Sequence, residues 1–229
     1  MATFGKAREL ASDTFTGMRE EMLETQIRRR GLTDEGVLRA MACVPRHEFL
    51  PLEVQSRSYE DVPLPIGGGQ TISQPYIVAI MTAGLHLDAT KKVLEIGTGC
   101  GYQAAVLSLM SGEVHSVEYR TDLAVAADQR LKRLGYSNVR IHCGDGSDGL
   151  PKFAPYDAIL VAAAAPAVPP PLLDQLGDGG RMIVPIGTED LQELVLVTRH
   201  GREYSFEQRG PCRFVPLLGR HGWKEWEFL

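Results

Sequence analysis

The segment "VLEIGTGCGYQ" sets Gly97, Gly99 and Gly101 between a short apolar run and a helical pattern. Glycines at such a strand–helix junction let the backbone approach a ligand closely, and the first turn of the helix offers unpaired N–H groups. A dinucleotide site needs a small residue five positions after the first glycine, and here that position holds Tyr102. A tight turn without a ligand is the alternative. The spacing therefore favours a ligand-binding loop that is not a dinucleotide site.

Acidic residues stand at three places where further groups of such a ligand could be held. Glu95, just before the loop, would repel a pyrophosphate but can help hold a cationic amino-acid moiety. Glu118 ends the next apolar run and can accept hydrogen bonds from both hydroxyls of a ribose. Asp145 in "CGDGSDG" can accept from an adenine amino group, and Gly146 lets the ring lie against the chain. The alternatives are a solvated strand-end carboxylate and an ordinary Asp-Gly turn, but strand ends that converge on one site favour a bound nucleoside.

Ser73 in "PIGGGQTISQP" is the candidate for a reacting or positioning hydroxyl. A serine just before Pro75 and the helical pattern "PYIVAIMTAGL" is typical of a helix N-cap, and the sequence alone favours this structural role. The hydroxyl can still donate to a carboxylate oxygen while it accepts from a backbone N–H, so the two roles are compatible. Thr71 is expected to support the loop or a cofactor.

Polar residues upstream of this loop have less distinct roles. Arg46 and His47, in "VPRHEFLP", could serve as a carboxylate clamp or a base, but we expect a packed structural corner. Tyr59 and Asp61 either line a peptide groove or occupy the surface. The six histidines show no catalytic grouping in the sequence.

The pattern of apolar runs predicts the elements that position these residues. Residues 14–43 have two helical patterns, the first ending at Gly31 and the second starting behind Thr33 and Asp34. From Lys92 onward, short apolar strands alternate with helices, which predicts a mostly parallel, doubly wound α/β sheet. The turn sequence "RHGR" lies between two alternating runs and predicts an antiparallel edge hairpin over 191–209. The strands are expected at 93–96, 114–117, 139–142, 158–161 and 181–186, and the helices at 102–110, 121–135 and 169–177.

Length and composition indicate one globular domain. We expect residues 1–229 to form it, with 1–66 as a helical extension and connector and 67–229 as the cofactor-binding core. A net charge of −5 and the lack of Lys/Arg clusters near the motifs weigh against a nucleic-acid partner. Prolines interrupt the longest apolar run, and the first residues lack the apolar segment of a signal peptide, so no membrane partner and a cytoplasmic location are expected. The four cysteines form no CxxC pair, and no metal site is expected.

Beyond these patterns, the sequence resembles the protein-L-isoaspartate (D-aspartate) O-methyltransferase family. The acidic-x-Gly-x-Gly-x-Gly loop is similar to motif I of S-adenosylmethionine-dependent methyltransferases in general. Much more specific are "VPRHEF" and "GQTISQP", and the similarity extends through "APYDAILVAAAAPAVP" to "RFVPLLG". The resemblance implies a Rossmann-like class I methyltransferase fold and methyl transfer from S-adenosyl-L-methionine to the free α-carboxylate of L-isoaspartyl residues, leaving S-adenosyl-L-homocysteine. D-Aspartyl residues are a second candidate substrate. The ester would then collapse without the enzyme to a succinimide, which hydrolyses partly to normal aspartate.

The same resemblance implies roles for individual residues. Ser73 aligns with the active-site serine of the family. The expected partners are age-damaged proteins, which a monomeric enzyme would recognise with little sequence specificity. Three departures stand out: Cys100 and Ala162 occupy places where relatives have other small residues, and near Leu217 and Leu218 some relatives have a polar cofactor contact. The implied cofactor-binding residues are Gln70, Thr71, Ile72, Ser73, Glu95, Gly97, Thr98, Gly99, Cys100, Gly101, Glu118, Asp145 and Gly146.

The chemistry agrees with what the sequence offers. A main-chain-type carboxylate has a pKa of about 3.5 and is already anionic at neutral pH, so its methylation needs no general base. The protein then has to align nucleophile, methyl group and sulfur and to exclude water. A methyltransferase for small molecules or RNA and a non-catalytic binding module remain the alternatives, with a nicotinamide dehydrogenase the weakest.

Overall fold

The computed structural model describes residues 14–188 and 190–224. It is built on a seven-stranded sheet with the strand order β5-β4-β3-β6-β7-β8-β9. Strands β3 to β7 pair in parallel, and β8 and β9 complete the sheet as an antiparallel edge hairpin. The strands are β3 (Lys92–Ile96), β4 (Glu113–Glu118), β5 (Val139–Cys143), β6 (Tyr156–Val161), β7 (Leu176–Gly187), β8 (Gln192–His200) and β9 (Glu203–Cys212). The predicted alternation and edge hairpin are confirmed.

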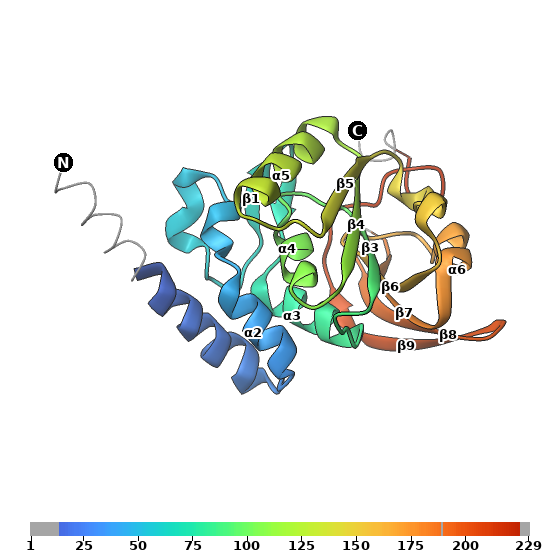
Figure 1. Ribbon diagram of the computed structural model, residues 1–229, viewed down its shortest axis with the longest axis horizontal. Coiled ribbons are helices and arrows are strands. Elements are labelled where there is room, and N and C mark those ends of the chain that lie inside the picture. The colour runs from blue at the N-terminus through green and yellow to red at the C-terminus, as the bar shows by residue number, and fades with distance from the viewer. Residues whose placement is uncertain (1–13, 189, 225–229) are drawn as a thin grey trace.

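Helices cover both faces because the strands carry apolar side chains on both sides. On one face, Val93, Val114 and Leu160 pack with α3 and α4 residues, and on the other, Leu94, Ile159 and Met182 pack with Leu172 of α6. Figure 1 shows α3, α4 and α5 on one side of the sheet and α6 on the other. These helices are α3 (Pro75–Gly84), α4 (Tyr102–Ser108), α5 (Thr121–Arg133) and α6 (Pro170–Gln175), with short turns η5 (Gly146–Asp148) and η6 (Pro151–Phe153).

The first described helical segment ends, and the second helix begins, where the sequence predicts. Residues 14–21 are α-helical and continue through η1 (Met22–Ile27) and η2 (Arg28–Arg30) to Gly31, which takes the left-handed conformation at φ 91°. Asp34 then caps α2 (Glu35–Cys43) by accepting a hydrogen bond from the Val37 N–H at 3.0 Å. Two 3₁₀ turns, η3 (Arg46–Phe49) and η4 (Leu52–Arg57), lead toward the sheet.

The segment that contains Ser73 is more ordered than a glycine-rich loop. Leu64–Gly67 (β1) and Gln70–Ile72 (β2) pair as a separate two-stranded antiparallel hairpin with Gly68 and Gly69 at its turn. Gly68 has a φ of 59° and Gly69 a φ of 72°, a left-handed geometry that glycine adopts at little cost.

The strand order reverses at β3, which positions the site. The chain runs outward from β3 to β4 and β5 and then returns to place β6 on the other side of β3. In open α/β sheets the crevice beyond the carboxyl ends of the strands at such a reversal is where ligands bind. Gly97 and Ala162 stand there, directly after β3 and β6.

Candidate functional site

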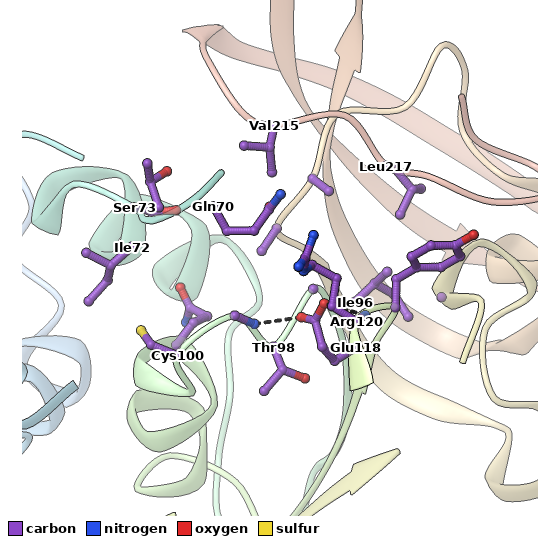
Figure 2. A pocket seen from close by; sticks show the side chains of 18 of the residues that line it. Gln70, Ile72, Ser73, Ile96, Thr98, Cys100, Glu118, Arg120, Val215 and Leu217 are labelled. Carbon is purple, nitrogen blue, oxygen red and sulfur yellow. Dashed lines mark hydrogen bonds between the residues drawn. The ribbon is translucent and has the colours of Figure 1, made fainter. Parts of the chain in front are cut away.

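A cavity occupies this crevice and brings most of the predicted site together. The β1–β2 hairpin, the glycine loop, the end of β4 and the 215–218 segment form its walls. Figure 2 shows Gln70 and Ser73 facing Glu118 across it, with Val215 and Leu217 on a third side. The residues that line it are Gln70, Thr71, Ile72, Ser73, Val78, Ile96, Gly97, Thr98, Gly99, Cys100, Tyr102, Gln103, Val117, Glu118, Tyr119, Arg120, Gly146, Ala162, Ala163, Val215, Pro216, Leu217 and Leu218.

Backbone geometry shapes the glycine loop. Gly97 and Gly99 have φ angles of 92° and 53°, values that residues with a β-carbon rarely adopt. The Gly97 N–H donates to the Val117 carbonyl at 2.8 Å, which ties the loop to the neighbouring strand. Gly101, with a φ of 90°, starts α4 and packs against Leu131 rather than lining the cavity. Gly101 is therefore placed in a helix-packing position and not in the expected ligand contact.

Glu118 is held so that its carboxylate faces the cavity. One oxygen, Oε2, accepts from the Gly99 N–H at 2.8 Å, and Oε1 accepts from the Arg120 N–H at 3.0 Å. The residue is buried. Each carboxylate oxygen has two lone pairs, so one on each oxygen stays available for a ligand hydroxyl. This geometry suits a pair of ribose hydroxyls, as the sequence predicts.

Glu95 lies elsewhere. Its side chain is fully buried beneath the loop and is not among the residues that line the cavity. Burial raises the pKa of Glu95 to about 8, despite a very short hydrogen bond from the Ser116 hydroxyl, so the neutral carboxyl is favoured at neutral pH. The prediction that Glu95 helps hold a cationic group is thus corrected: successive residues of a strand face opposite sides, and Glu95 points away from the ligand side that Ile96 lines.

Of the neighbouring residues Asp145 and Gly146, likewise, only Gly146 lines the cavity. Asp145 caps η5 by accepting from the Ser147 N–H at 2.9 Å and hydroxyl at 2.7 Å, and it accepts from the Arg220 N–H at 2.7 Å. Burial alone would raise the pKa of Asp145, but these hydrogen bonds outweigh it and lower that pKa. Gly146 lines the cavity, and a β-carbon there would lie 2.5 Å from Cγ2 of Ile96, so only glycine fits. Asp145 itself is not among the residues that line the cavity, and both of its carboxylate oxygens already accept hydrogen bonds from the protein. Its contact with an adenine amino group stays a prediction.

Ser73 lines the cavity but does not cap α3. The N-cap position belongs to Gln74, which makes no side-chain cap, and the Tyr76 N–H instead donates to Oδ1 of Asp61 at 3.1 Å. The prediction of a serine cap is therefore wrong. Among the described residues the Ser73 hydroxyl has no hydrogen-bond partner, so it is available to a ligand. Asp61 is a capping residue that also pairs with Arg30 at 2.7 Å.

Arg46 holds the backbone of Ser73 from behind. Its guanidinium is fully buried and donates to the Ser58 carbonyl at 2.7 Å and to the Ser73 carbonyl at 2.8 Å, and it lies 4.8 Å from the centre of the Tyr102 ring. His47 stacks on Phe15 at a centroid separation of 4.0 Å. The prediction of a packed structural corner is confirmed, and that corner touches the candidate active-site serine.

A second cleft opens beside the cavity. It shares the lining residues Thr71, Ser73, Ala162, Val215 and Pro216 with the first and extends between α3 and the 209–216 segment. Ser73 therefore stands where the two hollows meet. A molecule in the second cleft can reach a group bound in the first through this junction.

Several lining residues were not predicted from the sequence. Tyr119 and Arg120 adjoin the predicted Glu118, and Gln103 lies one residue beyond Tyr102. Their position close to the predicted Glu118 and to Tyr102 of the glycine-loop segment is the signal that could have identified them. The 215–218 segment has no local pattern of this kind and is indicated only by the family resemblance near Leu217 and Leu218; it reaches the site because the Leu217 N–H donates to the Ala164 carbonyl at 2.8 Å beside β6.

The residues present fit S-adenosylmethionine. Glu118 offers acceptors for ribose hydroxyls, and the buried Ile96, Val117 and Leu217 give apolar walls for the nucleoside. Among the described residues that line the cavity, Arg120 is the one basic side chain, so this lining lacks the cluster of cations that a pyrophosphate would favour. Gln70 and Gln103 add amide groups that can bind an amino-acid moiety.

Among residues 14–188 and 190–224 there is no group of three or more His, Cys, Asp or Glu side chains that could hold a metal ion. No helix among them is long and apolar enough to span a membrane.

Comparisons with known proteins agree with this site. The chain is 53% identical over 207 residues to a protein-L-isoaspartate O-methyltransferase of Methanoculleus marisnigri, covering 90% of this chain and 94% of that one. It is 51% identical to the protein of the same name from Roseiflexus castenholzii, covering 91% and 95%. A solved protein-L-isoaspartate O-methyltransferase superposes with a TM-score of 0.80 at 35% identity, over 89% of this chain and 67% of that one.

A Plasmodium falciparum protein, described as a candidate protein-L-isoaspartate O-methyltransferase and solved with S-adenosyl-L-homocysteine, superposes with a TM-score of 0.76 at 25% identity, over 87% of this chain and 98% of that one. The sequence model of the protein-L-isoaspartate(D-aspartate) O-methyltransferase family matches residues 18–222. The chain belongs to this family of S-adenosylmethionine-dependent methyltransferases.

Proposed function

We propose that the protein methylates the free α-carboxylate of L-isoaspartyl residues in damaged proteins and peptides and so starts their repair. The observation that carries this proposal is the position of Ser73 where the cofactor cavity meets a second, open cleft, with a hydroxyl that has no hydrogen-bond partner among residues 14–188 and 190–224. Family membership supplies the reaction class, and this junction supplies a place where a polypeptide carboxylate can reach the cofactor.

When bound, S-adenosylmethionine supplies a methyl group on a positively charged sulfur. The Glu118 carboxylate would hold the ribose, and the segments 70–73 and 97–100 would surround the rest of the molecule. Gly146 would leave room for the base next to Ile96. These residues orient the cofactor and exclude water, which raises the effective concentration of correctly aligned reactants.

The second cleft would hold the substrate. At neutral pH an α-carboxylate is ionised and needs no base. Ser73 Oγ would donate a hydrogen bond to one carboxylate oxygen and leave the other free to attack the methyl carbon, whose bond to sulfur breaks as the ester bond forms. Arg46 supports this role because it fixes the Ser73 carbonyl and hence the direction of the backbone. No metal enters this scheme.

A paired-peptide assay tests the proposal. Two synthetic peptides of identical sequence carry either an L-isoaspartyl or an L-aspartyl residue, and transfer of labelled methyl from S-adenosylmethionine to each is measured. The proposal predicts methylation of the isoaspartyl peptide alone. A third peptide, with the α-carboxylate of the isoaspartyl residue replaced by an amide, should accept no methyl group, because the nucleophile is missing.

A further inference from the structure

The second cleft has an unusual balance of charge. Its charged side chains are all arginines, namely Arg30, Arg209 and Arg213, and none of its lining residues in the described chain is Asp, Glu, Lys or His. The whole protein has a net charge of −5. Positive charge gathered at a cleft of an otherwise acidic protein points to a ligand that carries negative charge.

Two of the three arginines are already paired. Arg30 forms an ion pair with Asp61 at 2.7 Å and lies over the Tyr76 ring, 3.3 Å from its centre. Arg209 pairs with Glu207 at 2.8 Å. Both guanidinium charges are therefore partly neutralised by acidic groups of the protein itself.

Arg213 differs from them. Its side chain is exposed, and among the described residues its guanidinium makes no hydrogen bond or ion pair. An unpaired guanidinium at the wall of a substrate cleft can bind a carboxylate in a bidentate manner.

The backbone around Arg213 is firmly held. Buried Gln192 accepts from the Phe214 N–H at 2.7 Å and donates to the Phe214 carbonyl at 3.1 Å. The Val215 carbonyl accepts from the Ala164 N–H at 2.8 Å, which joins the segment to the end of β6. Arg213 thus projects from a fixed base, and less conformational freedom is lost when it binds a partner.

We propose that this cleft favours isoaspartyl sites with an acidic side chain nearby in the sequence, and that Arg213 pairs with that side chain. The proposal rests on the function proposed above. The reacting carboxylate belongs at the junction beside Ser73, so a guanidinium elsewhere in the cleft wall is available to a second carboxylate of the same polypeptide. Because Arg213 is exposed, the preference should be modest and should weaken as salt is added.

The test uses isoaspartyl peptides that differ at one neighbouring position. Glu or Gln is placed at one position at a time on either side of the isoaspartyl residue, and kcat/KM is measured at low salt. We expect Glu to exceed Gln by about two- to five-fold in at least one position, chiefly through KM, as for an exposed ion pair. In Arg213→Gln this ratio should fall to about one, and high salt should reduce it in the unmodified protein.

Two more variants sharpen the test. Arg213→Glu should reverse the preference, so that a Lys-containing peptide exceeds its Glu counterpart. Arg202→Gln removes an exposed arginine from the turn between β8 and β9, outside the cleft, and should keep the original Glu/Gln ratio. Thermal melts of all three variants confirm folding.

The outcomes separate the two proposals. A Glu/Gln ratio near one at every position overturns the acidic preference and leaves the methyltransferase function standing. A ratio that persists in Arg213→Gln, or an equal loss on both peptides in that variant, also overturns it, because Arg213 would then not bind the neighbouring carboxylate. A protein that methylates no isoaspartyl peptide overturns both proposals.

Discussion

The buried guanidinium of Arg46 donates a hydrogen bond to the carbonyl of Ser73 at 2.8 Å. The same guanidinium binds the Ser58 carbonyl at 2.7 Å and lies against Tyr102, which lines the cofactor cavity. The Arg46 side chain thus connects the segment that holds Ser73 with Tyr102 at the start of α4. Ser73 is held through its backbone, and its hydroxyl stays free.

Ser73→Ala should lower kcat for an isoaspartyl peptide by at least about ten-fold and leave cofactor affinity nearly unchanged. The substitution removes a donor to the reacting carboxylate but keeps the carbonyl that Arg46 binds. Steady-state kinetics and calorimetric titration with S-adenosylmethionine measure the two effects. Ser205→Ala on the exposed edge strand β9 is the control. An equal loss of turnover and cofactor affinity would assign Ser73 to cofactor binding.

Arg46→Met should lower the free energy of unfolding by about 2–6 kcal/mol, because the buried Ser58 carbonyl and the part-buried Ser73 carbonyl lose their donor at about 1–3 kcal/mol each. Urea denaturation measures the loss, and Arg202→Met provides a control at an exposed turn. Arg46→Lys should recover only part of the stability, since one ammonium cannot match the planar geometry of the guanidinium. If Arg46→Met is as stable as the unmodified protein, the corner does not depend on these bonds.

Glu118→Gln should weaken S-adenosylmethionine binding by about 10- to 100-fold, the usual loss for hydrogen bonds to a charged group. The amide has one acceptor oxygen, whereas Glu118 now accepts from both Gly99 and Arg120. Calorimetric titration gives the affinity. Glu203→Gln, which removes the same charge at the exposed start of β9, should bind normally. Unchanged affinity in Glu118→Gln would exclude this carboxylate from the cofactor site.

Gly68→Ala and Gly69→Ala form a matched pair in the hairpin turn. Both residues have positive φ, 59° and 72°, so alanine costs about 1–2 kcal/mol at each. A β-carbon on Gly68 would lie 3.0 Å from the Arg120 guanidinium, whereas one on Gly69 meets nothing within 4 Å. Because Arg120 lines the cavity, Gly68→Ala should weaken cofactor binding several-fold more than Gly69→Ala.

The difference should vanish when both substitutions are made in an Arg120→Ala protein, which is a double-mutant test of the contact. A difference that persists without Arg120 would place its origin in the hairpin backbone.

Glu95 should make stability depend on pH. Its pKa is about 8 in the folded protein, raised by burial from 4.5, so the unfolded chain ionises first as the pH rises. The stabilising contribution of Glu95 is therefore full below pH 4.5 and is lost progressively up to about pH 8, on the order of a few kcal/mol. Glu95→Gln cannot ionise and should flatten this part of the profile in urea titrations. Parallel profiles for the two proteins would show that Glu95 does not titrate in this range.

The sequence predicted the sheet well because its strands have strong, regular signals. "VLEI" and "AILV" are apolar on both faces and are separated by clear helical patterns, so the parallel sheet follows from local information. The glycine loop and Glu118 were also predictable, because the carboxyl ends of parallel strands must share one edge of the sheet. By contrast, the side toward which Glu95 points depends on which residues of a short strand face which side of the sheet, and a strand that is apolar on both faces does not show this.

Long-range contacts explain the other errors. Ser73 has the local signature of a cap, but Asp61, fifteen residues before Tyr76, reaches that helix N-terminus first. Local interpretation accounts for the turn that Asp145 forms with Ser147, but not for the hydrogen bond that Asp145 accepts from the N–H of Arg220, far along the chain. No pattern near either residue encodes these partners, because tertiary packing brings them together. The second cleft, which Arg213 lines, likewise forms only when α3 and the segment after β9 come together.

The paired-peptide methylation assay is the decisive measurement of whether the protein is an isoaspartyl methyltransferase. Methyl transfer from S-adenosylmethionine to an isoaspartyl peptide and to its normal aspartyl twin is followed under identical conditions, and the methylated peptide is then tracked as it converts to succinimide and aspartyl forms. We expect transfer to the isoaspartyl peptide only, followed by the appearance of normal aspartyl peptide. Equal methylation of both peptides, or of neither, would contradict it.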